Sequence, residues 1–351
     1  MQTVVITGVS GYWGQRVAQQ LLAMPDLRVL GVDRRPPAEL LPGLDFIKAD
    51  IRNPLLVELL RAEQVDTLLH LAWRQRQWRR EEDFESNVLG AMQLFGACVD
   101  AGVQQVVWPS STAVYGAQPE NPLYMPESTP LAARSSYAWL HDTLEVERFI
   151  ASFAAEYPGT RFAVLRFANI IGVEVDSPLT RLLRQPVWPD LLGFDPLLQV
   201  IDADDALAAL VHAARSPLDG PINLAAPGIL SLCQLAGRLG RPTLPILHWL
   251  VYWGWPLMSS LPAGRELLAW FPLEPDYLRY PWIADLSRMQ GEPGLLPQWS
   301  ARQAVQRLVE GLRVAGYQAA AAEQPYAADQ LERVLAQRGA AAAGRVQVDV
   351  L

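Results

Sequence analysis

Short runs of aliphatic and β-branched residues alternate with longer segments of helical periodicity through the first half of the chain. Strands are predicted at residues 4–7, 29–33, 45–48, 67–71, 105–109 and 161–166. Helices are predicted between them, at residues 13–23, 54–63, 84–101 and 136–156. Because parallel strands need a crossover connection that is usually a helix, this alternation is typical of a parallel sheet covered on both faces. The pattern therefore predicts an α/β protein with a doubly wound parallel sheet.

The pattern becomes irregular and rich in Pro and Trp from Val175 onward. Residues 198–201 and 221–225 still have strand character, and we expect both to return to the first sheet. Helices are predicted at residues 205–215 and 300–315, the second with Ser300 as its N-cap. The predicted organisation is a sheet domain at 1–174 with returning segments at 197–226, a smaller interleaved domain at 175–196 and 227–317, and an Ala-rich tail at 318–351.

Three glycines, Gly8, Gly11 and Gly14, lie between the first predicted strand and the first predicted helix. A tight turn there presents main-chain N–H groups at the positive end of a helix, where a pyrophosphate binds and a Cβ would block its approach. An ordinary strand-to-helix turn is the alternative. Asp33 ends the second predicted strand about 20 residues later, where a carboxylate accepts hydrogen bonds from ribose hydroxyls. The combination predicts a dinucleotide-binding Rossmann fold.

These residues resemble the extended short-chain dehydrogenases/reductases, also called the NAD-dependent epimerase/dehydratase family. Thr7 and the three glycines match the family's Thr-Gly-x-x-Gly-x-x-Gly fingerprint, and further motifs follow in order over most of residues 3–312. The resemblance implies a smaller substrate domain beside the Rossmann sheet, and it implies that Asn169 contacts the substrate. The cofactor site that it implies is formed by Gly8, Gly11, Tyr12, Trp13, Gly14, Asp33, Arg34, Asp50, Ile51, Leu71, Ala72 and Asn87.

The choice between NAD and NADP depends on the residues at the end of the second predicted strand. Arg34 and Arg35 follow Asp33 and could hold a 2′-phosphate, or they could be ordinary solvated loop residues. The carboxylate of Asp33 repels a 2′-phosphate, because the two groups carry charges of the same sign. We therefore expect NAD in preference to NADP.

The family's reaction, as the resemblance implies it, needs a hydroxyl that orients the substrate, a tyrosine that exchanges a proton, and a lysine four residues after that tyrosine. Ser111 occupies the hydroxyl position, and Tyr137 occupies the tyrosine position beside the cofactor. His141 stands where the lysine is expected. The only lysine of the chain, Lys48, lies at the end of the third predicted strand and cannot replace it.

Two interpretations of His141 remain open. In the first, His141 binds the nicotinamide ribose and, when protonated, assists Tyr137; histidine is only partly charged at neutral pH, so it would assist less than lysine. In the second, the site has lost its chemistry. The sequence thus predicts an NAD-dependent oxidoreductase or epimerase that acts on an alcohol, ketone or sugar-like substrate. The alternative is a non-catalytic NAD-binding subunit or sensor.

The nature of the substrate depends on the second predicted domain. Residues 194–199 contain no arginine, although sugar-nucleotide enzymes of the family commonly bind the diphosphate with one there, so a nucleotide-sugar substrate is in doubt. An aromatic set in this domain suits an apolar pocket for a lipid-like alcohol or ketone. The same set could form the core of the domain, or a surface for a membrane or a partner protein. Its members are Trp249, Trp253, Trp255, Trp270 and Phe271.

The loop at residues 73–80, after the fourth predicted strand, combines two tryptophans with four arginines. It could bind a phosphate, a carboxylate or a coenzyme A tail, because guanidinium groups pair well with such anions. It could equally be a solvated helix face whose charge is balanced by Glu81, Glu82 and Asp83. Both interpretations stay open.

Composition excludes several other classes of function. A net charge of −8 and a pI near 5.1 disfavour nucleic-acid binding. Cys98 and Cys233 lie far apart without metal-ligand spacing, so we expect no disulfide and no metal site, and we expect both residues in the core.

The start of the chain lacks the basic and apolar pattern of a secretory leader, which predicts a cytoplasmic protein. Residues 244–261 are apolar, but prolines interrupt them and they are too short to span a membrane. The expected partner is a small-molecule substrate, and the resemblance implies pairing of two copies through helices of the sheet domain.

Overall fold

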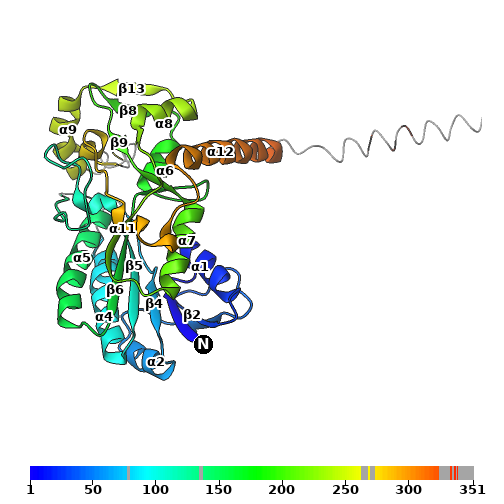
Figure 1. The fold of residues 1–351 in the computed structure, drawn as a ribbon. Helices are drawn as coiled ribbons and strands as arrows, with labels where there is room; N and C mark the ends of the chain where they lie inside the picture. The colour runs from blue at the N-terminus through cyan, green and yellow to red at the C-terminus, as the bar shows by residue number, and fades with distance from the viewer. Residues whose placement is uncertain are drawn as a thin grey trace, which may run out of the picture. The chain divides into compact units, whose positions relative to one another are not determined.

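The computed structural model describes residues 1–76, 80–133, 137–261, 268, 273–323, 333, 336 and 338. Residues 1–306 form one compact unit, and residues 307–351 belong to a second. The first unit contains the sheet (Figure 1). Residues of this unit line both of the cavities described below. The predicted domain boundaries at residues 174 and 317 stay a prediction.

A parallel sheet forms the centre of the first unit. Among the described residues it has seven strands in the order β11-β6-β5-β4-β1-β2-β3. All neighbouring pairs are parallel, and Val4, Val5 and Ile6 of β1 are at most 1% exposed, as expected for a strand covered on both faces. The predicted doubly wound sheet is therefore confirmed. Its strands are β1 Gln2–Thr7, β2 Leu27–Asp33, β3 Asp45–Lys48, β4 Thr67–His70, β5 Gln105–Ser111, β6 Arg161–Phe167 and β11 Gly220–Leu224.

Helices cover both faces of this sheet (Figure 1). Apolar side chains of α1 and α7 pack with alternate residues of the strands on one face, and those of α2, α4 and α5 pack on the other. The predicted helix at residues 84–101 is a continuous run of three elements, because a π-helical turn interrupts the α-helix. The helices are α1 Tyr12–Leu22, α2 Leu56–Ala62, α3 Glu81–Phe84, η1 Glu85–Leu89 (the π-helix), α4 Gly90–Ala101, α5 Ala138–Glu156 and α7 Ala203–Arg215.

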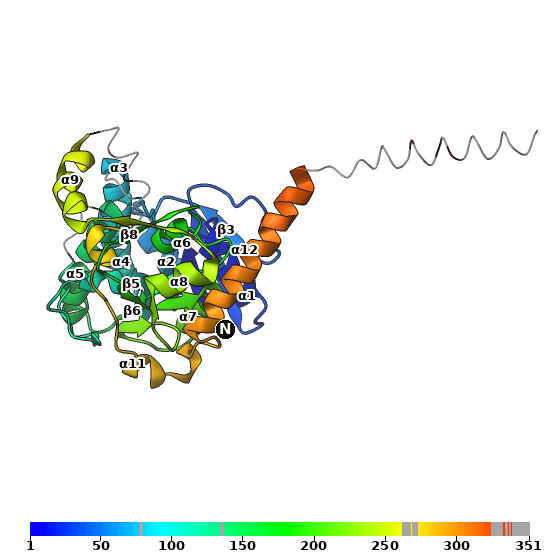
Figure 2. The same cartoon turned by 90° about the horizontal axis from the view of Figure 1, so that it is seen from above.

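Smaller elements follow β5 and the end of β6, and Figure 2 looks down on that end of the sheet. Three small two-stranded sheets pair β10 with β7, β12 with β9 and β13 with β8 among the described residues. The elements are η2 Thr112–Tyr115, β7 Asn169–Ile171, α6 Pro178–Leu183, β8 Trp188–Leu191, β9 Leu197–Leu198, β10 Val200–Asp202, β12 Leu230–Ser231, α8 Leu232–Leu239, β13 Thr243–Ile246, α9 His248–Ser260, η3 Pro275–Leu278, α11 Ser287–Gln290, η4 Pro293–Leu295 and α12 Ala301–Glu323.

Only one of the two predicted returning strands joins the main sheet. Residues 221–225 were predicted correctly, since β11 pairs with β6. The prediction for residues 198–201 was wrong: β9 pairs with β12, and β10 pairs with β7. β11 occupies the position beside β6, and β10 pairs instead with β7, the short strand that follows β6 in the chain.

Two further expectations concern helix ends and cysteines. Ser300 caps α12 as predicted, since its Oγ accepts from the Gln303 N–H at 3.4 Å while Gln303 Oε1 accepts from the Ser300 N–H at 2.9 Å. Cys98 is buried as expected, but Cys233 is exposed, which corrects the prediction of a core position.

None of the described helices is both long and apolar enough to cross a membrane.

A buried histidine in β4 predicts an acid-sensitive fold. His70 lies in the centre of the sheet with its Nδ1 2.7 Å from Thr7 Oγ1, and burial lowers the pKa of His70 to about 3. In the unfolded chain His70 takes up a proton below a pH of about 6.5, but in the folded protein it stays neutral until about pH 3. The free energy of unfolding therefore decreases as the pH is lowered from about 6.5 to about 3. At pH 4.5 we expect a loss of about 2–3 kcal/mol.

Urea unfolding at pH 7.5 and pH 4.5 measures this loss in the wild type and in His70→Asn. Between pH 7.5 and pH 4.5, the unfolding free energy of the variant should decrease by about 2–3 kcal/mol less than that of the wild type. This difference does not depend on how stable the variant is at pH 7.5. Equal losses in both proteins would show that His70 does not cause the acid sensitivity.

Candidate cofactor and substrate site

The loop between β1 and α1 has a backbone that requires glycine. Gly8 has a φ of +74°, and a Cβ on it would lie 2.5 Å from the Ala72 main-chain nitrogen. A Cβ on Gly14 would lie 2.3 Å from the Gly8 carbonyl oxygen, so α1 could not approach the loop so closely. Gly11 is the N-cap of α1 and offers no side-chain cap. The first N–H groups of α1 are therefore available to an anionic ligand.

A cavity of about 520 Å³ opens beside this loop, and we call it the glycine-loop cavity. Asp33 is held at its wall, since one carboxylate oxygen accepts from the Ser10 N–H at 3.1 Å and the other from the Arg35 N–H at 3.3 Å. Eight of the predicted cofactor residues are among the described residues that line it: Gly8, Gly11, Asp33, Arg34, Asp50, Ile51, Leu71 and Ala72.

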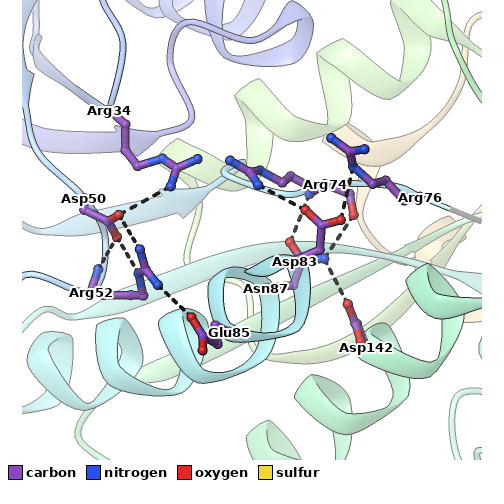
Figure 3. A network of polar contacts seen from close by, with 9 residues as sticks. All are labelled: Arg34, Asp50, Arg52, Arg74, Arg76, Asp83, Glu85, Asn87 and Asp142. Carbon is purple, nitrogen blue, oxygen red and sulfur yellow. Dashed lines mark hydrogen bonds and ion pairs between the residues drawn. The ribbon is translucent and has the colours of Figure 1, made fainter. Parts of the chain in front are cut away.

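Ion pairs neutralise much of the positive charge at the end of this cavity that Asp50 lines (Figure 3). Arg52 donates to both carboxylate oxygens of Asp50, at 3.0 and 2.9 Å, and these hydrogen bonds lower the pKa of Asp50. Arg34 lies 3.6 Å from the same carboxylate. Because Arg34 faces a carboxylate and follows Asp33, this end of the cavity suits a ribose with free hydroxyls better than a 2′-phosphate.

A second cavity, of about 370 Å³, contains both predicted catalytic hydroxyls, and we call it the serine-tyrosine cavity. Ser111 ends β5 and accepts a hydrogen bond from the Ala113 N–H at 3.2 Å. Tyr137 is 2% exposed, and its ring lies 6.2 Å from that of Trp255 in α9. Asn169 also lines the cavity and donates to the Gln199 carbonyl oxygen at 2.9 Å. The structure thus brings together three residues that are far apart in sequence.

The two cavities adjoin. Leu71 and Trp73, which follow β4, line both of them. Tyr12 and Trp13, predicted as cofactor residues, line the serine-tyrosine cavity, and Gly14 is buried against Gly8.

His141 does not join Tyr137 in the cavity. It is exposed, and it is not among the described residues that line either cavity. Tyr137 has extended φ and ψ angles and is the N-cap of α5, so it lies outside the helix on which His141 stands. Lys48 is at the end of β3, which is the edge strand of the sheet.

The wall of the serine-tyrosine cavity is mainly apolar and contains several aromatic residues. Its aromatic residues beyond Tyr137 include Trp13, Trp73, Trp139, Tyr277 and Trp282, most of which sequence reasoning missed. The charged side chains among its described lining residues are all acidic: Glu174, Asp176 and Glu274.

The predicted aromatic set of the second domain divides. Trp255 contacts Tyr137, whereas Trp249 and Trp253 lie on the exposed side of α9. Trp270 and Phe271 lie outside the described residues.

A buried polar network lies behind the serine motif. Ser110 donates a hydrogen bond to Glu147 of α5, and Glu147 forms an ion pair with Arg166 of β6 at 2.6 Å. Arg166 also donates to the Tyr115 hydroxyl at 2.8 Å, and that hydroxyl donates to Asn223 Oδ1 at 2.7 Å. The network connects β5, β6, α5 and β11, and so it fixes the position of Ser111. Sequence reasoning missed it, although a charged residue inside the apolar strand 161–166 was the available indication.

Asn87 supports the loop after β4. It is 1% exposed in the π-helix η1; its Oδ1 accepts from the Arg74 N–H, and its Nδ2 donates to the Arg74 carbonyl and to Asp142, each at 3.0 Å. It does not line either cavity among the described residues. Its direct partner in the structure is therefore the loop at residues 73–76, and residues 77–79 lie outside the described part of the chain.

A glycine loop before a helix, a carboxylate at the end of the next strand, and an adjoining cavity with a serine and a tyrosine define a dinucleotide-binding protein of the Rossmann class. The cradle fits NAD, because Gly8 and Gly14 let α1 begin close against the loop, with the first N–H groups of α1 uncapped by a side chain. The chain matches the NAD dependent epimerase/dehydratase family over residues 4–225, and it belongs to that family. Membership confirms the predicted family, fold class, NAD-dependent enzyme and cofactor.

Relatives agree with this assignment. An uncharacterized protein of Mycobacterium tuberculosis is 33% identical over 318 residues, covering 86% of this chain and 82% of that protein. A UDP-glucose 4-epimerase of Azospirillum brasilense is 27% identical over 217 residues, covering 57% of this chain and 60% of that protein. The solved structure of the UDP-glucose 4-epimerase of Thermotoga maritima with UDP-glucose has a TM-score of 0.67 at 19% identity and covers 90% of this chain and 99% of that chain.

Proposed function

We propose that the protein uses NAD to oxidise or reduce a neutral, largely apolar alcohol or ketone in the serine-tyrosine cavity. The observation that carries this proposal is that Ser111 and Tyr137 line one aromatic cavity, which adjoins the glycine-loop cavity at Leu71 and Trp73. A substrate oxygen in the first cavity would thereby be next to a cofactor in the second.

The residues divide the chemistry between them. Bound NAD would accept or return a hydride at the carbon that carries the reacting oxygen. Tyr137 accepts the hydroxyl proton during oxidation and returns it during reduction, and Ser111 hydrogen-bonds the same oxygen. The aromatic wall excludes water, so the polar contacts to that oxygen are stronger than in solution.

The charge of the cavity supports a neutral substrate. Glu174, Asp176 and Glu274 are the charged side chains among its described lining residues, and they would repel the diphosphate of a nucleotide sugar. The related UDP-glucose 4-epimerases make such a sugar the second candidate, with transient oxidation and return of the hydride at the same carbon. An apolar alcohol is favoured because apolar side chains, many of them aromatic, form most of the wall.

A substrate panel tests this proposal. The purified protein with NAD or NADH is mixed with secondary alcohols, ketones, sterols and UDP-sugars, and both nicotinamide absorbance and product stereochemistry are followed. We expect turnover of at least one apolar alcohol or ketone, lowered at least about 100-fold in Ser111→Ala. Turnover of UDP-sugars alone would overturn the substrate class. If NAD binds but no compound reacts, the non-catalytic alternative is supported.

A further inference from the structure

The loop after β4 places two arginines in the wall of the glycine-loop cavity, on the side toward Tyr137. Trp73 lines both cavities, Gln75 lines the serine-tyrosine cavity, and Arg74 and Arg76 line the glycine-loop cavity. Side chains of this loop therefore alternate between the two cavities. The loop is the partition between them.

The partition is attached to the start of α5. The Arg76 carbonyl oxygen accepts from the Trp139 N–H at 3.1 Å, two residues after Tyr137. The side-chain amide of Asn87 bonds the Arg74 main chain twice: its Oδ1 accepts from the Arg74 N–H, and its Nδ2 donates to the Arg74 carbonyl oxygen. The two guanidinium groups thus come from a backbone that is fixed relative to Tyr137 without any contribution from His141.

One buried carboxylate orients both guanidinium groups (Figure 3). Arg74 Nη1 lies 3.0 Å from Asp83 Oδ1, and Arg76 Nε lies 3.1 Å from Asp83 Oδ2. The Asp83 side chain is 5% exposed, whereas those of Arg74 and Arg76 are 33% and 46% exposed. Two guanidinium groups share this one buried carboxylate, and Glu82 is a further carboxylate among the described lining residues of the glycine-loop cavity. Each guanidinium has five N–H donors, of which a single carboxylate engages only a part.

The end of the same cavity that Asp50 lines is different. There Arg34 and Arg52 surround Asp50, and Arg52 also lies 3.3 Å from Glu85, so the positive charge is opposed by two carboxylates (Figure 3). Arg52 is thus paired with two carboxylates, whereas Arg74 and Arg76 share the single carboxylate of Asp83. A dinucleotide carries its negative charge on the diphosphate, between its two nucleosides.

We infer that Arg74 and Arg76, oriented by Asp83, form an anion subsite that binds the diphosphate of NAD. These arginines would then contact the cofactor from the side of α5, where His141 was expected but lies outside both sets of described lining residues. Arginine suits this task because its planar, always charged group pairs with two phosphate oxygens at once. The inference extends the proposed function, since it concerns the same cofactor site, but it can be tested without any substrate.

Calorimetric titration of the whole protein with NAD, and separately with adenosine, tests the subsite. We expect Arg74→Gln and Arg76→Gln each to weaken NAD binding about 10- to 100-fold, as expected for loss of a charge-assisted contact. Adenosine has no phosphate, so its affinity should stay within about twofold of the wild type. The affinity for NAD should also depend less on salt in both variants.

Two control variants complete the test. Arg28 of β2 pairs with Glu63 at 2.5 Å and lies outside both sets of described lining residues. Arg28→Gln should therefore leave NAD affinity unchanged. His141→Ala should do the same. The inference is overturned if the Arg74 and Arg76 variants bind NAD like the wild type, if they lose adenosine as strongly as NAD, or if His141→Ala weakens NAD as much as they do. Failure of every substrate in the panel would refute the proposed function and leave this result standing.

Discussion

Tyr137→Phe is expected to lower turnover at least about 1000-fold and to leave NAD affinity within about twofold of the wild type. The substitution removes the hydroxyl that exchanges a proton with the substrate and keeps the ring that packs 6.2 Å from Trp255. Steady-state kinetics with the best substrate of the panel, together with calorimetric titration of NAD, measure the two quantities. A loss of turnover without loss of cofactor identifies a group that acts in the chemical step.

Two other tyrosines of the same cavity are poorer candidates for this proton transfer. Tyr277 donates to the Ala113 carbonyl at 2.7 Å, and burial raises its pKa well above the usual value. Tyr12 has its hydroxyl 2.5 Å from Arg16 Nη1, and burial raises its pKa as well. Tyr124→Phe, at an exposed position away from both cavities, is the matched control and should keep full turnover. Turnover that survives Tyr137→Phe would remove Tyr137 from the mechanism.

The sheet was predictable because parallel strands are buried on both faces. Such strands are largely apolar runs, and each one ends where polar or glycine residues begin, so the predicted strand at residues 67–71 agrees with β4 to within one residue. The glycine loop was predictable for a similar reason. Gly8 and Gly14 are needed by local backbone contacts, and local requirements leave a pattern in the sequence.

The position of His141 was not predictable from spacing alone. Residues four apart share a face only when both are inside a helix, and α5 begins at Ala138. Tyr137 is the N-cap, with a ψ of 124°, so the expected relation between Tyr137 and His141 does not hold. Where a helix begins depends on packing and capping, and a boundary error of one residue is enough to separate two side chains.

Long-range polar contacts were also beyond the sequence pattern. Glu147 and Arg166 are 19 residues apart and meet because α5 packs on the sheet beside β6. The predicted helix at 84–101 hid the π-helix η1, whose register turns Asn87 toward the Arg74 main chain. In both cases tertiary packing determines which side chains support the site, and these contacts cannot be predicted from helical periodicity.

The support of the site can be separated from its chemistry. Asn87 and Asp83 are buried and hold the loop after β4, and Glu147 is buried and holds Ser110 at the end of β5. Ser111, Tyr137, Arg74 and Arg76 are carried on those loops or at element ends. A rigid sheet with variable loops at the carboxyl ends of its strands lets one fold serve many substrates.

Gly14→Ala is expected to weaken NAD binding at least about 100-fold, and it should also destabilise the fold by about 1–3 kcal/mol. The added Cβ would lie 2.3 Å from the Gly8 carbonyl oxygen and 2.6 Å from Val9 Cα, and both of these are backbone atoms that cannot rotate away. The helix and the loop must therefore separate. The N–H groups of the loop and of the first turn of α1 then no longer converge on one diphosphate. Calorimetric titration of NAD and urea unfolding measure the two effects.

Gly96→Ala is the matched control, because Gly96 is also a helical glycine, in α4, and a Cβ there would meet nothing within 4 Å. It should leave NAD affinity unchanged and raise the unfolding free energy by up to about 1 kcal/mol, since alanine favours a helix over glycine. A third measurement distinguishes geometry from general instability: the Gly14→Ala protein should lose NAD affinity even at a temperature where it is fully folded. If the folded variant binds NAD as tightly as the wild type, the close approach of α1 to the glycine loop is not what creates the cofactor site.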